Sequence, residues 1–164
     1  MNKLIRTIAG TMAALFIITG LSSCGTPSYK GYKHAPYTVR GQRYHPMHPH
    51  HAVGFEHRGG ASWYDERGFF TSGKTAIGEK FRAGSMAGAH KTLPIPCRVK
   101  VTNLRNGKTA TLRINDRGPF IAGRILDVTP AAAKKLGFKK QGLTEVHLKV
   151  ISVGDGKYKI TRRR

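Results

Sequence analysis

The sequence predicts an all-β protein, a small β-barrel with one short helix, preceded by a leader and a linker. Three features favour this class. Residues 97–102 alternate apolar and polar side chains, and residues 108–114 do so again after Asn106-Gly107, the dipeptide that tight β-hairpins prefer. Residues 146–150 alternate in the same way near the C-terminus. Because closing such strands into a barrel removes their exposed edges, we expect a closed sheet.

One short helix interrupts the predicted strands. Thr129 and Pro130 supply an N-cap and a first-position proline to residues 131–136, and Gly137 ends that run. A strand at residues 125–128 comes directly before it. The helix is therefore expected to lie between two strands of the barrel.

The strand at residues 109–114 runs into a turn that carries a carboxylate between two arginines, Arg113 and Arg117. Gly118-Pro119 ends the strand, so Asp116 lies at or just beyond its end. A rigid scaffold can hold a side chain at such a place and still present it to a cleft. A turn carboxylate paired with one of the two arginines is the structural alternative.

The first 23 residues are predicted to be a secretory leader. Two basic residues precede a largely apolar run, residues 8–21, that is too short to span a bilayer comfortably. The sequence LSSC at 21–24 resembles a bacterial lipobox, which predicts a lipid group on Cys24. Gly25, and not aspartate, follows the cysteine, which resembles lipoproteins exported to the outer membrane. We therefore expect the protein to lie at the periplasmic face of that membrane in a Gram-negative host. Ordinary leader cleavage, with Cys24 a free thiol, is the alternative.

Residues 24–59 are rich in Gly, Pro, Tyr and His and lack an apolar period, which predicts a lipidated N-terminus followed by a flexible tether. The histidines at 45–51 are separated by prolines in no closed metal-site spacing, so adventitious metal binding, or none, is favoured. The domain itself is expected at residues 60–151, and residues 152–164 are expected to form a solvated basic tail. We expect no metal and no cofactor.

The formal net charge of +21 predicts an anionic partner. The membrane surface, anionic envelope polymers, peptidoglycan carboxylates and nucleic acid all qualify on charge, and export disfavours nucleic acid. If Cys24 is lipidated, Cys97 is the one remaining thiol and no intramolecular disulfide can form. Cys97 alternates with Val99 and Val101, which predicts a small core residue and not a nucleophile.

Six motifs follow one another in the order of the rare lipoprotein A (RlpA-like) family, which the chain resembles over residues 59–151. They are GASWY at 60–64, TAIGE at 75–79, AHKTLP at 89–94, VTNLRNG at 101–107, RINDRGPF at 113–120 and GRILDV at 123–128. Linked motifs in a fixed order are far more specific than one short match. The resemblance implies a six-stranded double-psi β-barrel and lytic transglycosylase activity on bacterial peptidoglycan.

Cleaving a glycosidic bond requires a proton donor and a group that stabilises positive charge. Glu79 and Asp116 are the candidate acids, and the resemblance places the family's essential acids at both positions. Glu79 lies between Ile77 and Phe81, so we expect it to have the raised pKa of a proton donor. Asp116 is expected to have a lowered pKa and to be the ionised partner, provided that a neighbouring guanidinium reaches it. Ile77 stands where the family usually has Asn.

His90 completes the expected catalytic set, because the resemblance implies that it orients substrate or a carboxyl group. A histidine held by backbone groups, which fixes a loop, is the alternative. Five residues from the same motifs are expected to bind substrate: Trp63, Tyr64, Thr75, Asn115 and Arg117. A loop is expected at residues 65–74, where Phe69 and Phe70 either pack over the barrel or stack on a sugar.

Two functions are compatible with these features. The first is an endolytic peptidoglycan lytic transglycosylase that cuts the β-1,4 bonds between MurNAc and GlcNAc in peptide-stripped strands and leaves 1,6-anhydroMurNAc ends. Its expected setting is cell-wall remodelling or daughter-cell separation, with glycan strands, the membrane and divisome proteins as partners. The alternative is a non-catalytic lipoprotein that binds peptidoglycan or another polysaccharide through an expansin-like barrel. The presence of both acids favours the first.

Overall fold

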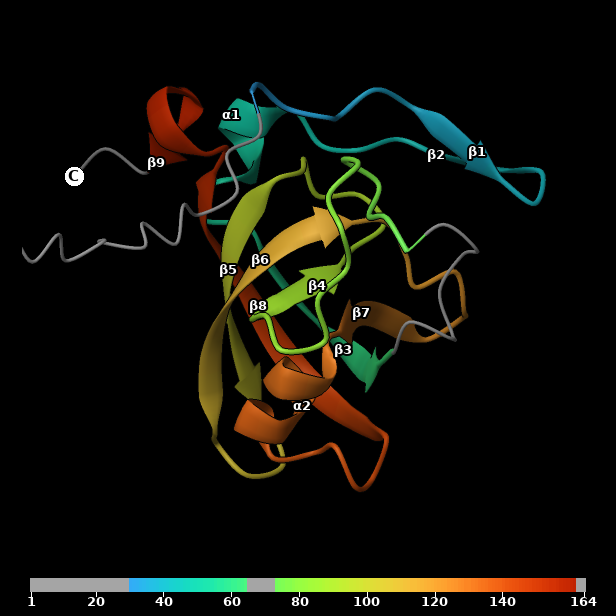
Figure 1. The fold of residues 1–164 in the computed structure, drawn as a ribbon, viewed down its shortest axis with the longest axis vertical. Coiled ribbons are helices and arrows are strands. Elements are labelled where there is room, and N and C mark those ends of the chain that lie inside the picture. The colour runs from blue at the N-terminus through green and yellow to red at the C-terminus, as the bar shows by residue number, and fades with distance from the viewer. Residues whose placement is uncertain (1–29, 65–72, 162–164) are drawn as a thin grey trace, which may run out of the picture.

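The computed structural model describes residues 30–64 and 73–161, and six strands in it close into a barrel. They are β3 (Glu56–Trp63), β4 (Ala87–Ala89), β5 (Cys97–Asn103), β6 (Thr109–Asp116), β7 (Arg124–Val128) and β8 (Leu143–Val153). Neighbouring strands follow the order β3-β7-β4-β6-β5-β8, and β8 pairs back with β3 (Figure 1). The β3–β7 and β4–β6 pairs are parallel, and the other barrel pairs are antiparallel. The predicted six-stranded barrel is confirmed.

The predicted hairpin is also confirmed, with a longer loop than expected. β5 and β6 pair antiparallel, with Val99 opposite Leu112. The Asn103 N–H donates to the Lys108 carbonyl at 2.9 Å, so four residues and not two connect the strands. A two-residue type I′ turn needs positive φ at both central positions, and of Asn106 and Gly107 only Gly107 has it, at +71°.

The helix α2 (Pro130–Leu136) lies where the capping residues predict it. Thr129 Oγ1 accepts a hydrogen bond from the Ala132 N–H at 3.4 Å, and Gly137 ends the helix with φ of +77°. The side chains of Asn103 and Asn106 donate to the Leu136 carbonyl at 3.0 and 3.1 Å. The hairpin therefore supplies hydrogen-bond donors to the last carbonyl of α2. This helix covers one end of the barrel (Figure 1).

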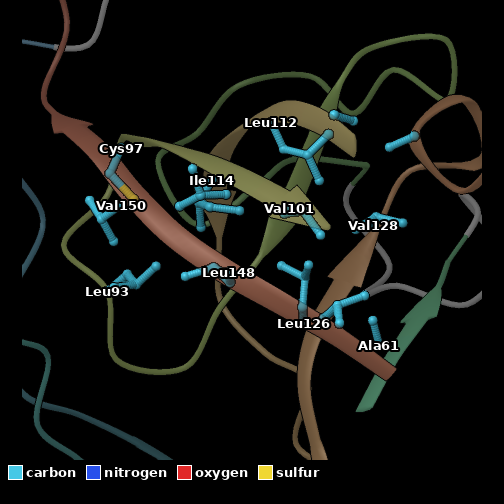
Figure 2. Close-up of a cluster of buried hydrophobic side chains, with 14 of the residues drawn as sticks. Ala61, Leu93, Cys97, Val101, Leu112, Ile114, Leu126, Val128, Leu148 and Val150 are labelled. Carbon is cyan, nitrogen blue, oxygen red and sulfur yellow. The ribbon is translucent and has the colours of Figure 1, made fainter. Parts of the chain in front are cut away.

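Apolar side chains from β3, β5, β6, β7 and β8 fill the interior. In Figure 2, Cys97, Leu93 and Val150 lie at one end of this core, and Leu126, Val128 and Ala61 lie at the other. Cys97 is 1% exposed, and burial raises the pKa of its thiol to about 12. Cys97 is therefore a core residue, as predicted, and is poorly suited to nucleophilic chemistry.

The predicted tether is wrong for its described part, because residues 30–55 pack on the barrel. This segment contains β1 (Tyr37–Val39), β2 (Gln42–Tyr44) and the short helix α1 (Pro49–Ala52), all at the end of the barrel opposite α2 (Figure 1). Backbone hydrogen bonds of 2.7 Å join Lys33 to Ile95 and Met47 to Thr92. Isolated main-chain pairs and single buried residues hold the segment, so its sequence shows no apolar period.

The aromatic residues of this segment also explain why it is ordered. The rings of Tyr37 and Tyr44 stack with centroids 5.3 Å apart, and Tyr44 lies 5.4 Å from Phe120. β3 then begins at Glu56, four residues before the expected start of the domain. The tyrosines that suggested a low-complexity linker are therefore packing groups.

The C-terminal segment is folded as well, and the predicted solvated tail is wrong for residues 152–161. β8 continues to Val153, a 3₁₀ turn, η1 (Gly156–Tyr158), follows, and β9 (Ile160–Thr161) pairs with β8. The predicted leader, Cys24, the Phe69-Phe70 pair and the last three arginines lie outside the described residues. Within residues 30–64 and 73–161, no helix is long and apolar enough to cross a membrane.

Candidate functional site

A cavity of about 400 Å³ opens beside the end of β6. Its walls come from β6, from the start of β5, from the end of β3 and from the turns between residues 73 and 86. Four of the sequence-predicted site residues line it: Tyr64, Thr75, Glu79 and Asn115. The tertiary structure therefore joins residues from three separate motifs.

A tight turn at residues 75–79 presents Glu79 to this cavity. The Gly78 N–H donates to the Thr75 carbonyl at 2.8 Å, and the Glu79 N–H donates to Thr75 Oγ1 at 3.2 Å. Gly78 has φ of +81°, a conformation that favours glycine. Ile77 packs against the barrel core and is not among the residues that line the cavity.

Glu79 is held by hydrogen-bond donors and not by apolar groups. Arg113 donates from Nη1 to Oε2 at 2.6 Å and from Nη2 to Oε1 at 2.9 Å. Asn115 Nδ2 donates to Oε2 at 2.9 Å. The apolar surroundings that Ile77 and Phe81 suggested are therefore not what Glu79 contacts, because a bidentate guanidinium faces it instead.

Asn115 contributes a second polar group to the cavity. Because its amide nitrogen donates to Glu79, its Oδ1 points elsewhere, and this oxygen is buried without a hydrogen-bond partner among the described residues. Leaving a buried acceptor unpaired costs about 1–3 kcal/mol.

Arg113 also binds a second carboxylate, which sequence reasoning missed. Its Nε and Nη2 donate to Asp155 Oδ2 at 3.2 and 2.6 Å, and both residues are buried. The Tyr32 hydroxyl donates to the Tyr158 carbonyl and so ties this segment to the N-terminal one. Gly154, with φ of +78°, lies so close that a Cβ would come within 2.4 Å of the Tyr158 oxygen. The one available signal was that Asp155 is the single acid in the predicted basic tail.

Asp116, the last residue of β6, is hydrogen-bonded to the turn at residues 75–79. It is 3% exposed, and its Oδ1 accepts hydrogen bonds from the Ala76 and Arg117 N–H groups, each at 2.8 Å. Burial raises the pKa of Asp116 to about 6, although the two hydrogen bonds and the charge of Arg117 act to lower it. The predicted lowered pKa is wrong, because neither neighbouring guanidinium forms an ion pair with this carboxyl group.

His90 lies away from the cavity and matches the structural alternative. Its Nδ1 accepts hydrogen bonds from the Thr92 and Leu93 N–H groups, both at 3.1 Å, and the ring is 2% exposed. Burial, with smaller contributions from nearby His57, Arg117 and Lys91, lowers the pKa of His90 to about 3. The imidazole is therefore neutral, and it holds the chain that enters β5.

Two of the expected substrate-binding residues make structural contacts instead. Arg117 donates from Nη2 to the Lys33 carbonyl at 2.8 Å and from Nη1 to the Leu93 carbonyl, and it lies 5.1 Å from the centre of the Tyr37 ring. Trp63 Nε1 donates to the Lys139 carbonyl at 3.0 Å. Neither residue is part of the cavity wall.

Asp127, on β7, has a structural role. It forms an ion pair with Arg124, at 3.8 Å, and accepts a hydrogen bond from Ser62. No group of three or more His, Cys, Asp or Glu side chains within the described ranges is arranged to hold a metal ion. Glu79 is the one acid of the described cavity wall, and Asp116 is not part of that wall but accepts a hydrogen bond from Ala76 in the turn that presents Glu79.

The amino-acid sequence is similar to those of known proteins. A family model described as lytic transglycolase matches residues 56–148. The endolytic peptidoglycan transglycosylase RlpA of Neisseria meningitidis serogroup A is 48% identical over 118 residues, which are 72% of this chain and 48% of that protein. The RlpA of Rickettsia bellii is 44% identical over 133 residues, 79% of this chain and 57% of that protein.

The chain spans about half the length of these curated relatives. The matched residues run from the first residue of β3 into β8 and include the whole cavity turn, Asn115 and Asp116. The chain therefore belongs to the lytic transglycolase family, and its closed six-stranded sheet is the double-psi β-barrel of that family.

Proposed function

We propose that this protein is an endolytic lytic transglycosylase that cleaves the β-1,4 bond between MurNAc and GlcNAc in peptidoglycan. The names of its relatives support the substrate and the reaction. The observation that carries the proposal is the contrast between two acids, Glu79 on the turn at residues 75–79 and Asp116 at the end of β6, which hydrogen-bonds to that turn. Asp116 is buried and has a pKa of about 6, whereas Glu79 faces a guanidinium beside the cavity.

Asp116 is the proton donor in this mechanism. Its Oδ2 accepts no hydrogen bond from the described residues. The protonated carboxyl group gives its proton to the glycosidic oxygen as the bond to the anomeric carbon breaks. The C6 hydroxyl of the same MurNAc then attacks that carbon and returns its proton to Asp116. The products are a free GlcNAc hydroxyl and a 1,6-anhydro ring, and no water is consumed.

Glu79 stabilises the positive charge that develops at the anomeric carbon. Arg113 binds two carboxylates, those of Glu79 and Asp155, so the three side chains together carry one net negative charge when both acids are ionised. The bidentate contact fixes the orientation of Glu79 before substrate arrives.

The test is to incubate the full chain with peptide-free glycan strands and to detect anhydromuramyl ends by mass spectrometry. Glu79→Gln and Asp116→Asn are each expected to reduce cleavage by about a thousandfold or more, because each removes a group that acts in the transition state. Glu145→Gln is the control, since Glu145 is exposed on β8. Strands that bind but stay intact with the wild-type protein would support the binding module instead.

The proposal extends to location: an envelope lipoprotein anchored through Cys24, on the outer membrane of a Gram-negative host. Because Lys33 is hydrogen-bonded to Ile95, about 30 Å of chain at most separates Cys24 from the first backbone contact with the domain. Radiolabelled palmitate should enter the wild-type protein and not Cys24→Ala. Divisome proteins are the proposed partners at the division site, and co-purification from dividing cells tests this.

A further inference from the structure

The charges around the cavity do not balance. Four cationic side chains line it, Lys80, Arg82, Arg98 and Arg113, whereas Glu79 is the one acid in its described wall. Glu79 is already bound by Arg113. The other three cations form no ion pair with a carboxylate in the described parts of the chain.

Of the three cations without an ion pair, Arg98 is the one that lies across the sheet from Arg113. It lies on β5 directly opposite Arg113 on β6, so both side chains project from the same outer face of the barrel. Like charges in such a cross-strand pair repel each other unless other groups compensate them. Glu79 and Asp155 compensate Arg113, and Arg98 is left half-buried with its guanidinium unmatched.

We propose that Arg98, assisted by the exposed Lys80 and Arg82, binds a carboxylate of the substrate next to the cleavage site. A guanidinium presents two parallel N–H groups that match a carboxylate, and the two outer cations raise the local concentration of an anionic strand. This inference rests on the proposed function. It adds a binding group that neither the acids nor Asn115 supplies.

Two parts of peptidoglycan carry such a group. A peptide-free MurNAc residue has the carboxylate of its lactyl ether, attached directly to the sugar. A peptide-bearing residue has that group in amide linkage, and its carboxylates lie farther out on the stem peptide. Both sources share one chemistry, and the experiment separates them.

The experiment measures dissociation constants for three preparations of strands. The first is peptide-free, the second is the same material with its lactyl carboxylates converted to methylamides, and the third retains its stem peptides. The full chain carries Asp116→Asn so that strands stay intact, and Arg98→Gln is compared with Arg98→Lys. Arg105→Gln is the matched control, because Arg105 lies in the exposed loop after β5 and not on the cavity.

Arg98→Gln should weaken binding of the preferred strands about tenfold, because a charge-assisted contact is lost. The dissociation constant of Arg98→Lys should lie between those of Arg98→Gln and the parent. Arg105→Gln should bind the strands as tightly as the parent does. If the lactyl group is the ligand, methylamidation should weaken the parent as much as Arg98→Gln does and should not weaken that variant further. If the stem peptide supplies the carboxylate, the effect should appear with peptide-bearing strands alone.

Equal binding of all strands by the parent and by Arg98→Gln would overturn the proposal. Circular dichroism of each variant establishes that it is folded. If the wild-type protein cuts none of the strands, the proposed activity fails, and the dissociation constants still decide whether Arg98 reads a carboxylate.

Discussion

Glu79 and Asp155 accept hydrogen bonds from the same guanidinium group, that of Arg113. The first acid lies on the cavity turn, and the second lies beyond β8, outside the residues that the family model matches. A contact from outside the family segment therefore fixes the arginine that orients the cavity carboxylate. This relationship makes Asp155 a positioning residue, since it acts through Arg113.

Replacing Asp155 tests this role. Asp155→Asn keeps the shape but removes the charge that holds Arg113, so kcat should fall about tenfold while KM changes less than about twofold. Asp155→Glu should restore part of the loss. Steady-state cleavage of peptide-free strands gives both constants, with Glu145→Gln as the control. A lower melting temperature with an unchanged kcat would mean that Asp155 only stabilises the fold.

The rate of cleavage should depend on pH through Asp116. The proton donor must be protonated, and burial raises its pKa to about 6, so half of it has lost the proton near that pH. We expect kcat/KM to fall about tenfold for each pH unit above that point. The measurement is initial rate against pH from 4.5 to 8.5, in buffers of constant ionic strength. A rate that stays constant or rises between pH 6 and 8 would assign the proton to another group.

Asp116→Asn should stabilise the fold at neutral pH even though it abolishes cleavage. Because the folded pKa is about 6 and the ordinary value is 3.8, the native state keeps a proton that the unfolded chain releases between these values. Wild-type stability therefore falls as pH rises through this window. The variant should be more stable by up to about 3 kcal/mol at pH 7.5 and by little at pH 3.5. Urea unfolding of both proteins at the two pH values measures the difference. A gain in stability at pH 7.5 no larger than the gain at pH 3.5 would contradict the burial argument.

His90→Gln should affect stability more than catalysis. The variant loses the ring nitrogen that accepts two backbone N–H groups, which should cost about 1–3 kcal/mol at pH 7. Burial lowers the pKa of His90 to about 3, so the wild type loses stability as pH falls from 6.5, where the unfolded chain begins to bind the proton. The difference between the two proteins should therefore shrink toward pH 4.

The readout that separates the two roles of His90 is the rate of the folded variant. We expect its kcat on peptide-free strands to stay within about twofold of the wild-type value, because His90 is not part of the cavity wall. A kcat reduced a hundredfold in a folded variant would restore the substrate-orienting role that the sequence suggested.

Much of the barrel can be derived from local patterns. The β5–β6 hairpin follows from alternation around a glycine-containing loop, and α2 follows from Thr129, Pro130 and Gly137. Each signal lies within a few residues of the element that it specifies, so no distant contact is needed to recognise it. The same reasoning found Glu79 and Asn115, which do line one cavity.

The tertiary structure alone decided how the charged groups are paired and which acid is desolvated. The sequence places Arg113 and Arg117 beside Asp116, yet Arg113 binds Glu79 and Asp155, and Arg117 binds backbone carbonyls. Strand alternation explains why Arg113 does not bind Asp116, because the two residues are three positions apart and face opposite sides of β6.

The sequence by itself therefore determined the β5–β6 hairpin, the strands β7 and β8, the helix α2 and the residue types available for chemistry. Only the folded chain determined that residues 30–55 cover the barrel, that Asp155 reaches Arg113, and that burial raises the pKa of Asp116. The physical reason is that burial and ion pairing depend on which distant groups exclude water from a site, and neighbours in sequence do not specify those groups.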